Sequence, residues 1–126
     1  MSDRIAHVAR NFEKTVGYEI GYGQGEGEMV CNQFVVAVLR ASVDRNFEYA
    51  LADEFVQSPK LSVPTSPAPG DLVHWPGHIG VVLDPDQGTF IGSQSSTGVA
   101  ISNYKKGWWG GEYGGRAPDY FLRWGR

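Results

Sequence analysis

The sequence predicts an α+β fold in which N-terminal helices pack on one face of an antiparallel β-sheet. Two observations carry this prediction. In the first half, apolar residues recur at the three- and four-residue spacing of helices. In the second half, short apolar or alternating runs are separated by turn residues, as in a meander of strands. Helices first and strands second is the pattern of an α+β protein. At 126 residues, the chain is predicted to be one domain covering residues 1–126.

The predicted helices span residues 2–14, 31–43 and 46–57. Each carries an apolar stripe at helical spacing, and in the third this stripe consists of Phe47, Leu51 and Phe55. Between the first two helices, residues 17–27 have a glycine at nearly every second position. Glycine is costly inside helices and strands, so this segment is predicted to be a loop.

The predicted strands span residues 71–75, 79–83, 89–93, 99–103 and 120–124. Turn signals separate them, among them Pro76-Gly77. The proline-rich residues 62–70 lead into the first strand and are predicted to be an extended connector. From Tyr104 onward the chain is basic, aromatic and rich in glycine. We interpret this segment as a glycine loop covering one edge of the core rather than as a binding surface.

Composition excludes several classes of function. The net charge of -3 and pI near 5.5 argue against nucleic-acid binding. One cysteine allows no internal disulfide. The longest apolar run is far shorter than the roughly 18 residues of a membrane span, so no membrane association is predicted. We see no signal peptide at the N-terminus and expect a protein made as a soluble cytosolic chain, which other machinery must carry if it acts outside the cell.

Cys31 is the strongest candidate for a catalytic residue. It opens the second predicted helix directly after the glycine-rich loop. Unpaired N–H groups at a helix start favour the thiolate, and they can also stabilise an oxyanion. A lone cysteine is more often a buried structural residue, but its place after a loop that allows close backbone approach favours a nucleophile.

His78 is the candidate base, because it stands after Pro76-Gly77 at the start of a predicted strand. It would take the proton of Cys31, hold the thiolate as an ion pair and protonate the leaving amine. His74 is the rival and is assigned a structural or cleft-lining role, whereas His7 is expected in solvent on the first helix. A zinc site is not expected, because the intervening Pro-Gly breaks the helix that an i, i+4 histidine pair would need. No other cofactor is predicted.

These residues together resemble the NlpC-type cell-wall peptidases of the papain-like superfamily. The matching blocks are Tyr18 to Gly27, Cys31 to Val35, Pro69 to Trp75, His78 to Val82, Phe90-Ile91 and Gly98-Val99. The resemblance spans roughly residues 17–103, most of the chain, and the blocks come in the order that the family has. The lecithin:retinol acyltransferase type has its histidine block before its cysteine block, so the chain order argues against it.

The resemblance implies a papain-like fold with Cys31 as nucleophile and His78 as base. It also implies a cleft-lining tyrosine, which is Tyr18 or Tyr22 here, and we add Trp75 as a candidate substrate-binding residue. The family's third catalytic residue, usually a histidine, falls on Gly92, where this sequence departs from the pattern. Strand alternation puts Gln94 on the same face, and its amide oxygen could accept the His78 N–H. Ser93 is the alternative, and a two-residue dyad is a third option.

The activity implied is hydrolysis of the peptidoglycan stem peptide, most often at the D-glutamyl–diaminopimelate bond. The chain also looks similar to the small amidase effectors that bacteria deliver to the periplasm of rivals by type VI secretion, which usually have a cognate immunity protein. Asn32-Gln33 replaces the Ser-Gly that usually follows the cysteine, so the subfamily stays open. A CHAP-like amidase, a phage lysin domain, a thiol transferase or deamidase acting on a protein, and an inactive binding module remain alternatives.

Overall fold

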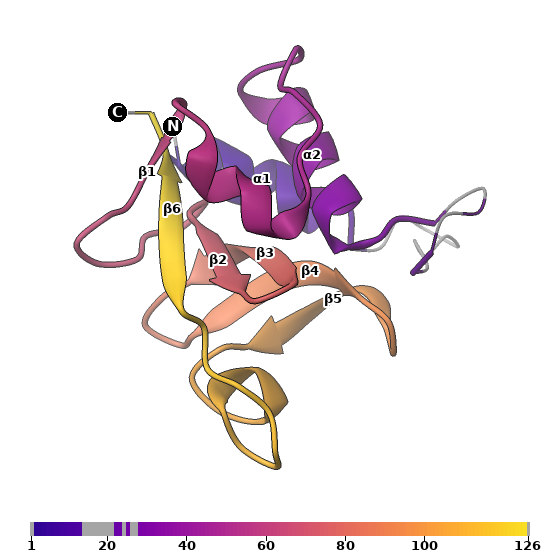
Figure 1. Ribbon diagram of the computed structural model, residues 1–126, viewed down its shortest axis with the longest axis vertical. Coiled ribbons are helices and arrows are strands. Elements are labelled where there is room, and N and C mark those ends of the chain that lie inside the picture. The colour runs from indigo at the N-terminus through magenta and orange to yellow at the C-terminus, as the bar shows by residue number, and fades with distance from the viewer. Residues whose placement is uncertain (1, 14–21, 24, 26–27, 126) are drawn as a thin grey trace.

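A six-stranded antiparallel sheet in the order β1-β6-β2-β3-β4-β5 forms the centre of the structure. The computed structural model describes residues 2–13, 22–23, 25 and 28–125. The helices α1, α2 and η1 cover one face of the sheet, and a loop that contains η2 lies on the other side (Figure 1). The elements are α1 Ser2–Asn11, α2 Cys31–Ser42, η1 Ala52–Gln57, β1 Leu61–Ser62, β2 Leu72–Trp75, β3 His78–Asp84, β4 Thr89–Gln94, β5 Gly98–Asn103, η2 Trp108–Gly110 and β6 Tyr120–Trp124. The α+β class predicted from sequence is confirmed.

The first two predicted helices are present with small changes at their ends. In α1, Ile5 and Ala9 are fully buried, whereas His7 is exposed as expected. At the start of α2, the Val30 N–H donates to the side-chain oxygen of Gln33, which satisfies one of the backbone groups left free at a helix end. Most of α2 is buried against the sheet and α1. The glycine-rich segment 17–27 lies largely outside the described residues.

The prediction of a third helix over residues 46–57 is wrong for its first half. The 3₁₀ helix η1 forms over the second half of this range, and the residues before it are extended or in turns. The reason is tertiary: Arg40 Nε donates to the Phe47 carbonyl, and Asn32 Nδ2 donates to the Ala50 carbonyl. Both donors come from α2 and bind carbonyls that a helix would have used internally. Leu51 is accordingly exposed and does not belong to an apolar stripe.

The strands agree closely with the sequence prediction, and the two-residue β1 is the one that it missed. β2 and β3 form a hairpin in which Trp75 pairs with His78. Its two-residue turn needs a left-handed residue, which Gly77 supplies at φ 78°. This turn is central to the site, because it brings the start of β3 to a fixed place beside the helical layer.

Two separate apolar clusters lie on the two faces of the sheet. The larger one joins α1, α2 and η1 to the sheet. The smaller one consists of Val73, Trp75, Val82, Phe90 and Tyr104, with Trp109 and Phe121 packed against it. The glycine-rich segment that follows β5 covers this second cluster, as the sequence interpretation held. None of the helices in the described part of the chain is long and apolar enough to cross a membrane.

Candidate active site

Cys31 is the first residue of α2, and its thiol lies against the β2–β3 turn. Its side chain is buried, and Sγ is 3.8 Å from the Gly77 carbonyl oxygen, to which it donates. The backbone N–H of Ile79, the residue after His78, also donates to the sulfur. The thiol therefore contacts the backbone of the residues on both sides of His78.

Burial dominates the electrostatics of the thiol. It raises the pKa of Cys31 above its ordinary value of 9.0, and the nearby Asp53 carboxylate adds to the rise. Backbone N–H groups of Ile79, Asn32 and Cys31 itself lower the pKa, but by less. The N–H groups at the helix start thus favour the thiolate, as expected, but removal from water disfavours the charged form more strongly.

His78 opens β3 and is also buried. Burial, and then the nearby His74, lower its pKa from 6.5 to about 4, so the imidazole is neutral at pH 7. Its ring lies flat against Trp109, with centroids 4.3 Å apart and planes 14° from parallel. Among the described residues, no hydrogen bond joins its ring to the Cys31 thiol. The structure therefore brings the thiol to the turn that carries His78, with both groups in their neutral forms.

His74 lies on the opposite face of the sheet from His78, toward the helical layer. Its Nδ1 is 2.8 Å from an Asp119 carboxylate oxygen, and its Nε2 is 2.8 Å from an Asp53 oxygen. Its ring also stacks on Tyr120 at 4.3 Å. Both ring nitrogens of His74 thus contact carboxylates rather than the thiol.

Asp53 links His74 to the β2–β3 turn that the thiol contacts. Besides His74, the same carboxylate oxygen accepts the Gly77 N–H at 2.9 Å. These two hydrogen bonds are the main reasons for the lowered pKa of Asp53. Asp53 on η1 therefore anchors the β2–β3 turn, although it is not among the residues expected from the sequence. No motif marks it, and the segment around it was interpreted as an ordinary helix.

Gln94 and Ser93 end β4 and point to opposite faces of the sheet. Gln94 is buried, and its Oε1 accepts hydrogen bonds from Ser102 Oγ at 3.2 Å and from Thr97 Oγ1 at 3.4 Å. Ser93 Oγ donates instead to the Met29 carbonyl in the helical layer. Of the two candidates for a third catalytic residue, Gln94 is the one on the face that carries His78.

Two buried nitrogens lack a hydrogen-bond partner in the part of the chain that the structure describes. They are His78 Nε2 and Gln94 Nε2. Val81 pairs with Ile91, and continuing that antiparallel register toward the start of β3 places His78 opposite Gln94. Buried polar groups are nearly always paired, so two unpaired atoms at facing positions are informative.

The candidate substrate-binding residues are placed differently from one another. Tyr18 lies outside the described residues, and Tyr22 is 39% exposed. Trp75 is 2% exposed, and its indole N–H donates to the Trp109 carbonyl at 3.0 Å, so it lies in the second apolar cluster rather than on a surface. No group of three or more His, Cys, Asp or Glu side chains within residues 2–13, 22–23, 25 and 28–125 could hold a metal ion.

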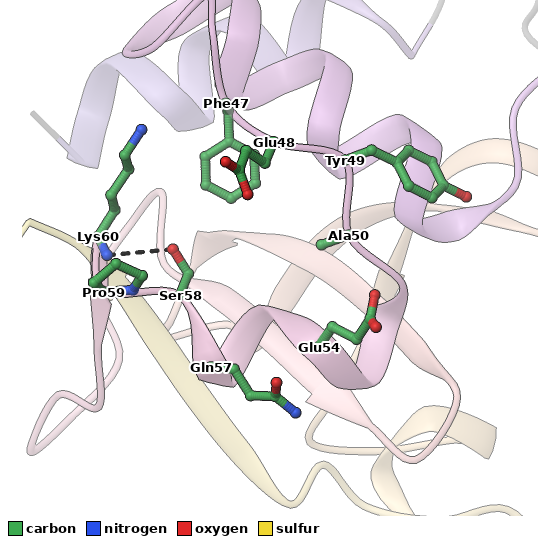
Figure 2. A pocket seen from close by; sticks show the side chains of 9 residues that line it. All are labelled: Phe47, Glu48, Tyr49, Ala50, Glu54, Gln57, Ser58, Pro59 and Lys60. Carbon is green, nitrogen blue, oxygen red and sulfur yellow. Dashed lines mark hydrogen bonds between the residues drawn. The ribbon is translucent and has the colours of Figure 1, made fainter.

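A hollow of about 330 Å³ lies between η1 and the extended segment before it (Figure 2). Its lining residues are Phe47, Glu48, Tyr49, Ala50, Glu54, Gln57, Ser58, Pro59 and Lys60. A second hollow lies along α2 and shares Tyr49 with the first. Tyr49 is linked to the thiol's neighbour, because its hydroxyl accepts a hydrogen bond from Asn32. Neither Cys31 nor His78 is part of either lining.

Comparison with solved structures identifies the fold. The chain superposes on the crystal structure of the NlpC/p60 domain of the peptidoglycan hydrolase SagA with a TM-score of 0.67. The match covers 98% of both chains at 17% sequence identity. No protein-family model matches the sequence, and a comparison with curated proteins finds no match. The expected NlpC-type fold is therefore confirmed, on structure rather than on sequence.

Proposed function

We propose that this protein is a cysteine amidase that hydrolyses an amide bond in the peptide part of peptidoglycan. One observation carries the proposal: in an NlpC/p60 fold, the Cys31 thiol at a helix start lies against the strand that His78 opens. A nucleophile and a base on adjoining elements are the minimum that amide hydrolysis by a thiol requires. The N–H groups at the start of α2 would face the oxyanion that forms on the substrate carbonyl.

In the resting state of this site, the Cys31 thiol and the His78 imidazole are both neutral. The pKa of Cys31 is above 9.0 and that of His78 is about 4, so a preformed thiolate–imidazolium pair is strongly disfavoured. Proton transfer from sulfur to imidazole must then accompany attack on the substrate rather than precede it. Hydrogen bonds in unliganded active sites often tighten only when substrate binds, and we propose that the thiol and His78 meet at that stage.

The reaction proceeds in two halves. Sγ of Cys31 bonds to the substrate carbonyl carbon as its proton passes to His78. The C–N bond then breaks, and the imidazolium returns that proton to the leaving amine, which leaves a thioester on Cys31. A water molecule gives a proton to His78 and attacks the thioester. The carboxylate product leaves, and the proton returns to sulfur.

Gln94 is proposed as the residue that orients the His78 ring. The oxygen and nitrogen of a side-chain amide can be exchanged by a half-turn of the group. After that exchange, Gln94 Oε1 would face His78 Nε2, and its NH₂ group would donate to the hydroxyls of Ser102 and Thr97. Both unpaired nitrogens would then have partners, and His78 Nδ1 would be the nitrogen left to exchange a proton with the thiol.

Digestion of purified sacculi tests the proposal. We expect the wild-type protein and the His7→Ala control to release soluble muropeptides, because His7 is exposed on α1. The Cys31→Ala and His78→Ala variants should release none while keeping a folded circular-dichroism spectrum. Mass spectrometry of the products should show cleavage at the D-glutamyl–diaminopimelate bond, which the family resemblance favours. Equal release by wild type and Cys31→Ala would overturn the proposal.

We further propose that the enzyme acts in the periplasm of a target cell and that a cognate immunity protein blocks it in the producer. This rests on the resemblance to small type VI amidase effectors. Expression directed to the periplasm of a test bacterium should cause lysis, whereas cytosolic expression should be harmless. Co-expression of the gene next to it should suppress the lysis if that gene encodes the immunity protein. Toxicity in the cytosol would point to a different substrate.

A further inference from the structure

The segment after β5 forms a hydrogen-bonded loop whose geometry leaves little freedom. Gly107 and Glu112 are joined by two hydrogen bonds, one through the backbone and one through the Glu112 carboxylate. The Arg116 N–H donates to the Trp108 carbonyl, which closes the loop. At Gly115 a Cβ atom would lie 2.0 Å from the same Trp108 oxygen, so only glycine fits there. The loop therefore holds its central residues in one place.

Trp109 is the residue that this loop directs onto the sheet. Its indole stacks on the His78 ring, as described above, and also contacts Trp75 at 5.0 Å and Phe90 at 6.3 Å between ring centroids. Its carbonyl oxygen accepts the Trp75 indole N–H, which fixes the backbone as well as the ring. Its neighbour Trp108 is 54% exposed and makes none of these ring contacts.

A flat aromatic contact restricts His78 in two ways. It limits rotation of the imidazole about the bond to its Cβ, because turning the ring would drive its edge into the indole. It also keeps water from one face of the ring. The charged group that acts on His78 is His74 on β2, while Asp53 and Cys31 contact the preceding residue, Gly77, and none of these groups belongs to the loop. The contribution of the loop is thus steric and apolar rather than ionic.

We propose that Trp109 is a positioning residue for the proposed reaction: its indole holds the His78 imidazole in the plane from which that ring exchanges a proton with Cys31. The proposal rests on the proposed function for its catalytic meaning, but the stacked contact itself can be tested separately. It also assigns the loop after β5 to the active site, where the sequence indicated only a cover over the core.

Three substitutions of Trp109 test the proposal. Trp109→Phe keeps a flat ring, Trp109→Leu keeps apolar volume without one, and Trp109→Ala removes both. We expect kcat for release of muropeptides to fall at least tenfold in the Leu and Ala variants and to be largely restored in the Phe variant, with KM little changed. In the Leu and Ala variants, the pKa of His78, read from the NMR signal of its ring, should rise by one pH unit or more. The acid limb of the pH–rate profile should move upward with it. Trp108→Ala is the matched control and should leave both readouts unchanged.

The outcomes separate the two proposals. If Trp109→Leu retains the wild-type His78 ring shift, pKa and kcat, the stack does not position the ring and the inference is wrong. The Leu variant decides this even if Trp109→Ala fails to fold. If the wild-type protein releases no muropeptides at all, the proposed function fails. The NMR comparison still shows in that case whether Trp109 holds the His78 ring.

Discussion

Acid should destabilise this protein through the protonation of His78 in the unfolded chain. The perturbation is a fall in pH from 7 to 4, compared between the wild type and His78→Phe. Phenylalanine keeps a flat ring against Trp109 but carries no titratable group. The pKa of His78 is about 4 in the folded protein and near 6.5 when the chain is unfolded. Between these values the unfolded chain binds a proton that the folded chain does not, so stability falls as the pH falls.

The magnitude follows from the difference between the two pKa values. Each pH unit of difference is worth about 1.4 kcal/mol, so the full effect is about 3 kcal/mol. About 2 kcal/mol of it should already be lost at pH 5, and almost none at pH 7. His78 is 9% exposed, so solvent screening does not reduce this figure much. For a domain of this size, such a loss is a large share of the total stability.

Urea denaturation at pH 7, 6, 5 and 4 measures the effect. We expect the free energy of unfolding of the wild type to fall by about 3 kcal/mol more than that of His78→Phe over this range. Carboxylates such as Asp44, whose pKa is lowered by Lys60, contribute to acid unfolding in both proteins and cancel in the comparison. His7→Phe, a change at an exposed histidine, should keep the wild-type slope. If wild type and His78→Phe lose stability in parallel, the reasoning about the buried imidazole is wrong.

Three further outcomes are expected. The rate of Cys31 alkylation by iodoacetamide should rise with pH through 9 without a plateau at neutral pH, because burial raises the thiol's pKa; a plateau would indicate a preformed ion pair. Arg123→Met should lower the urea unfolding free energy by about 3 kcal/mol, because it leaves the fully buried Asp71 carboxylate without its ion pair; a loss below about 1 kcal/mol would contradict this. Asn32→Ala should cost about 1 to 3 kcal/mol in the same assay through the unpaired Ala50 carbonyl, and an unchanged midpoint would count against the account given for the segment before η1.

Local sequence signals were sufficient to predict the helices and strands that local interactions determine. The meander of strands was predictable because each turn carries its own chemistry, as Gly77 does between β2 and β3. The α2 helix was predictable because its buried stripe has helical spacing. The false helix before η1 had the same kind of stripe, but Asn32 and Arg40 bind its carbonyls from a distance. No periodicity in the segment itself could reveal those donors.

The same distinction applies to the candidate site, where residues in local motifs were predictable and residues brought in by distant parts of the chain were not. Cys31 and His78 stand in recognisable motifs at the starts of a helix and a strand, so the sequence singles out both as candidates. The partners of His74 are 21 and 45 residues away along the chain, and only the folded sheet brings Asp53 and Asp119 to it. Trp109 comes from a loop whose glycines and aromatic residues predict a cover and say nothing of what lies beneath it.

The position of β6 has a consequence for biosynthesis. This last strand is inserted between β1 and β2, so a nascent chain on the ribosome has an open gap in the middle of its sheet until residue 124 has emerged. Asp119, which holds His74, arrives equally late. A chain that ends early leaves β2 with an unsatisfied edge and His74 without one of its two carboxylate partners. We therefore expect the sheet to be completed only after β6 has left the ribosome, so the fold forms late relative to the synthesis of its other strands.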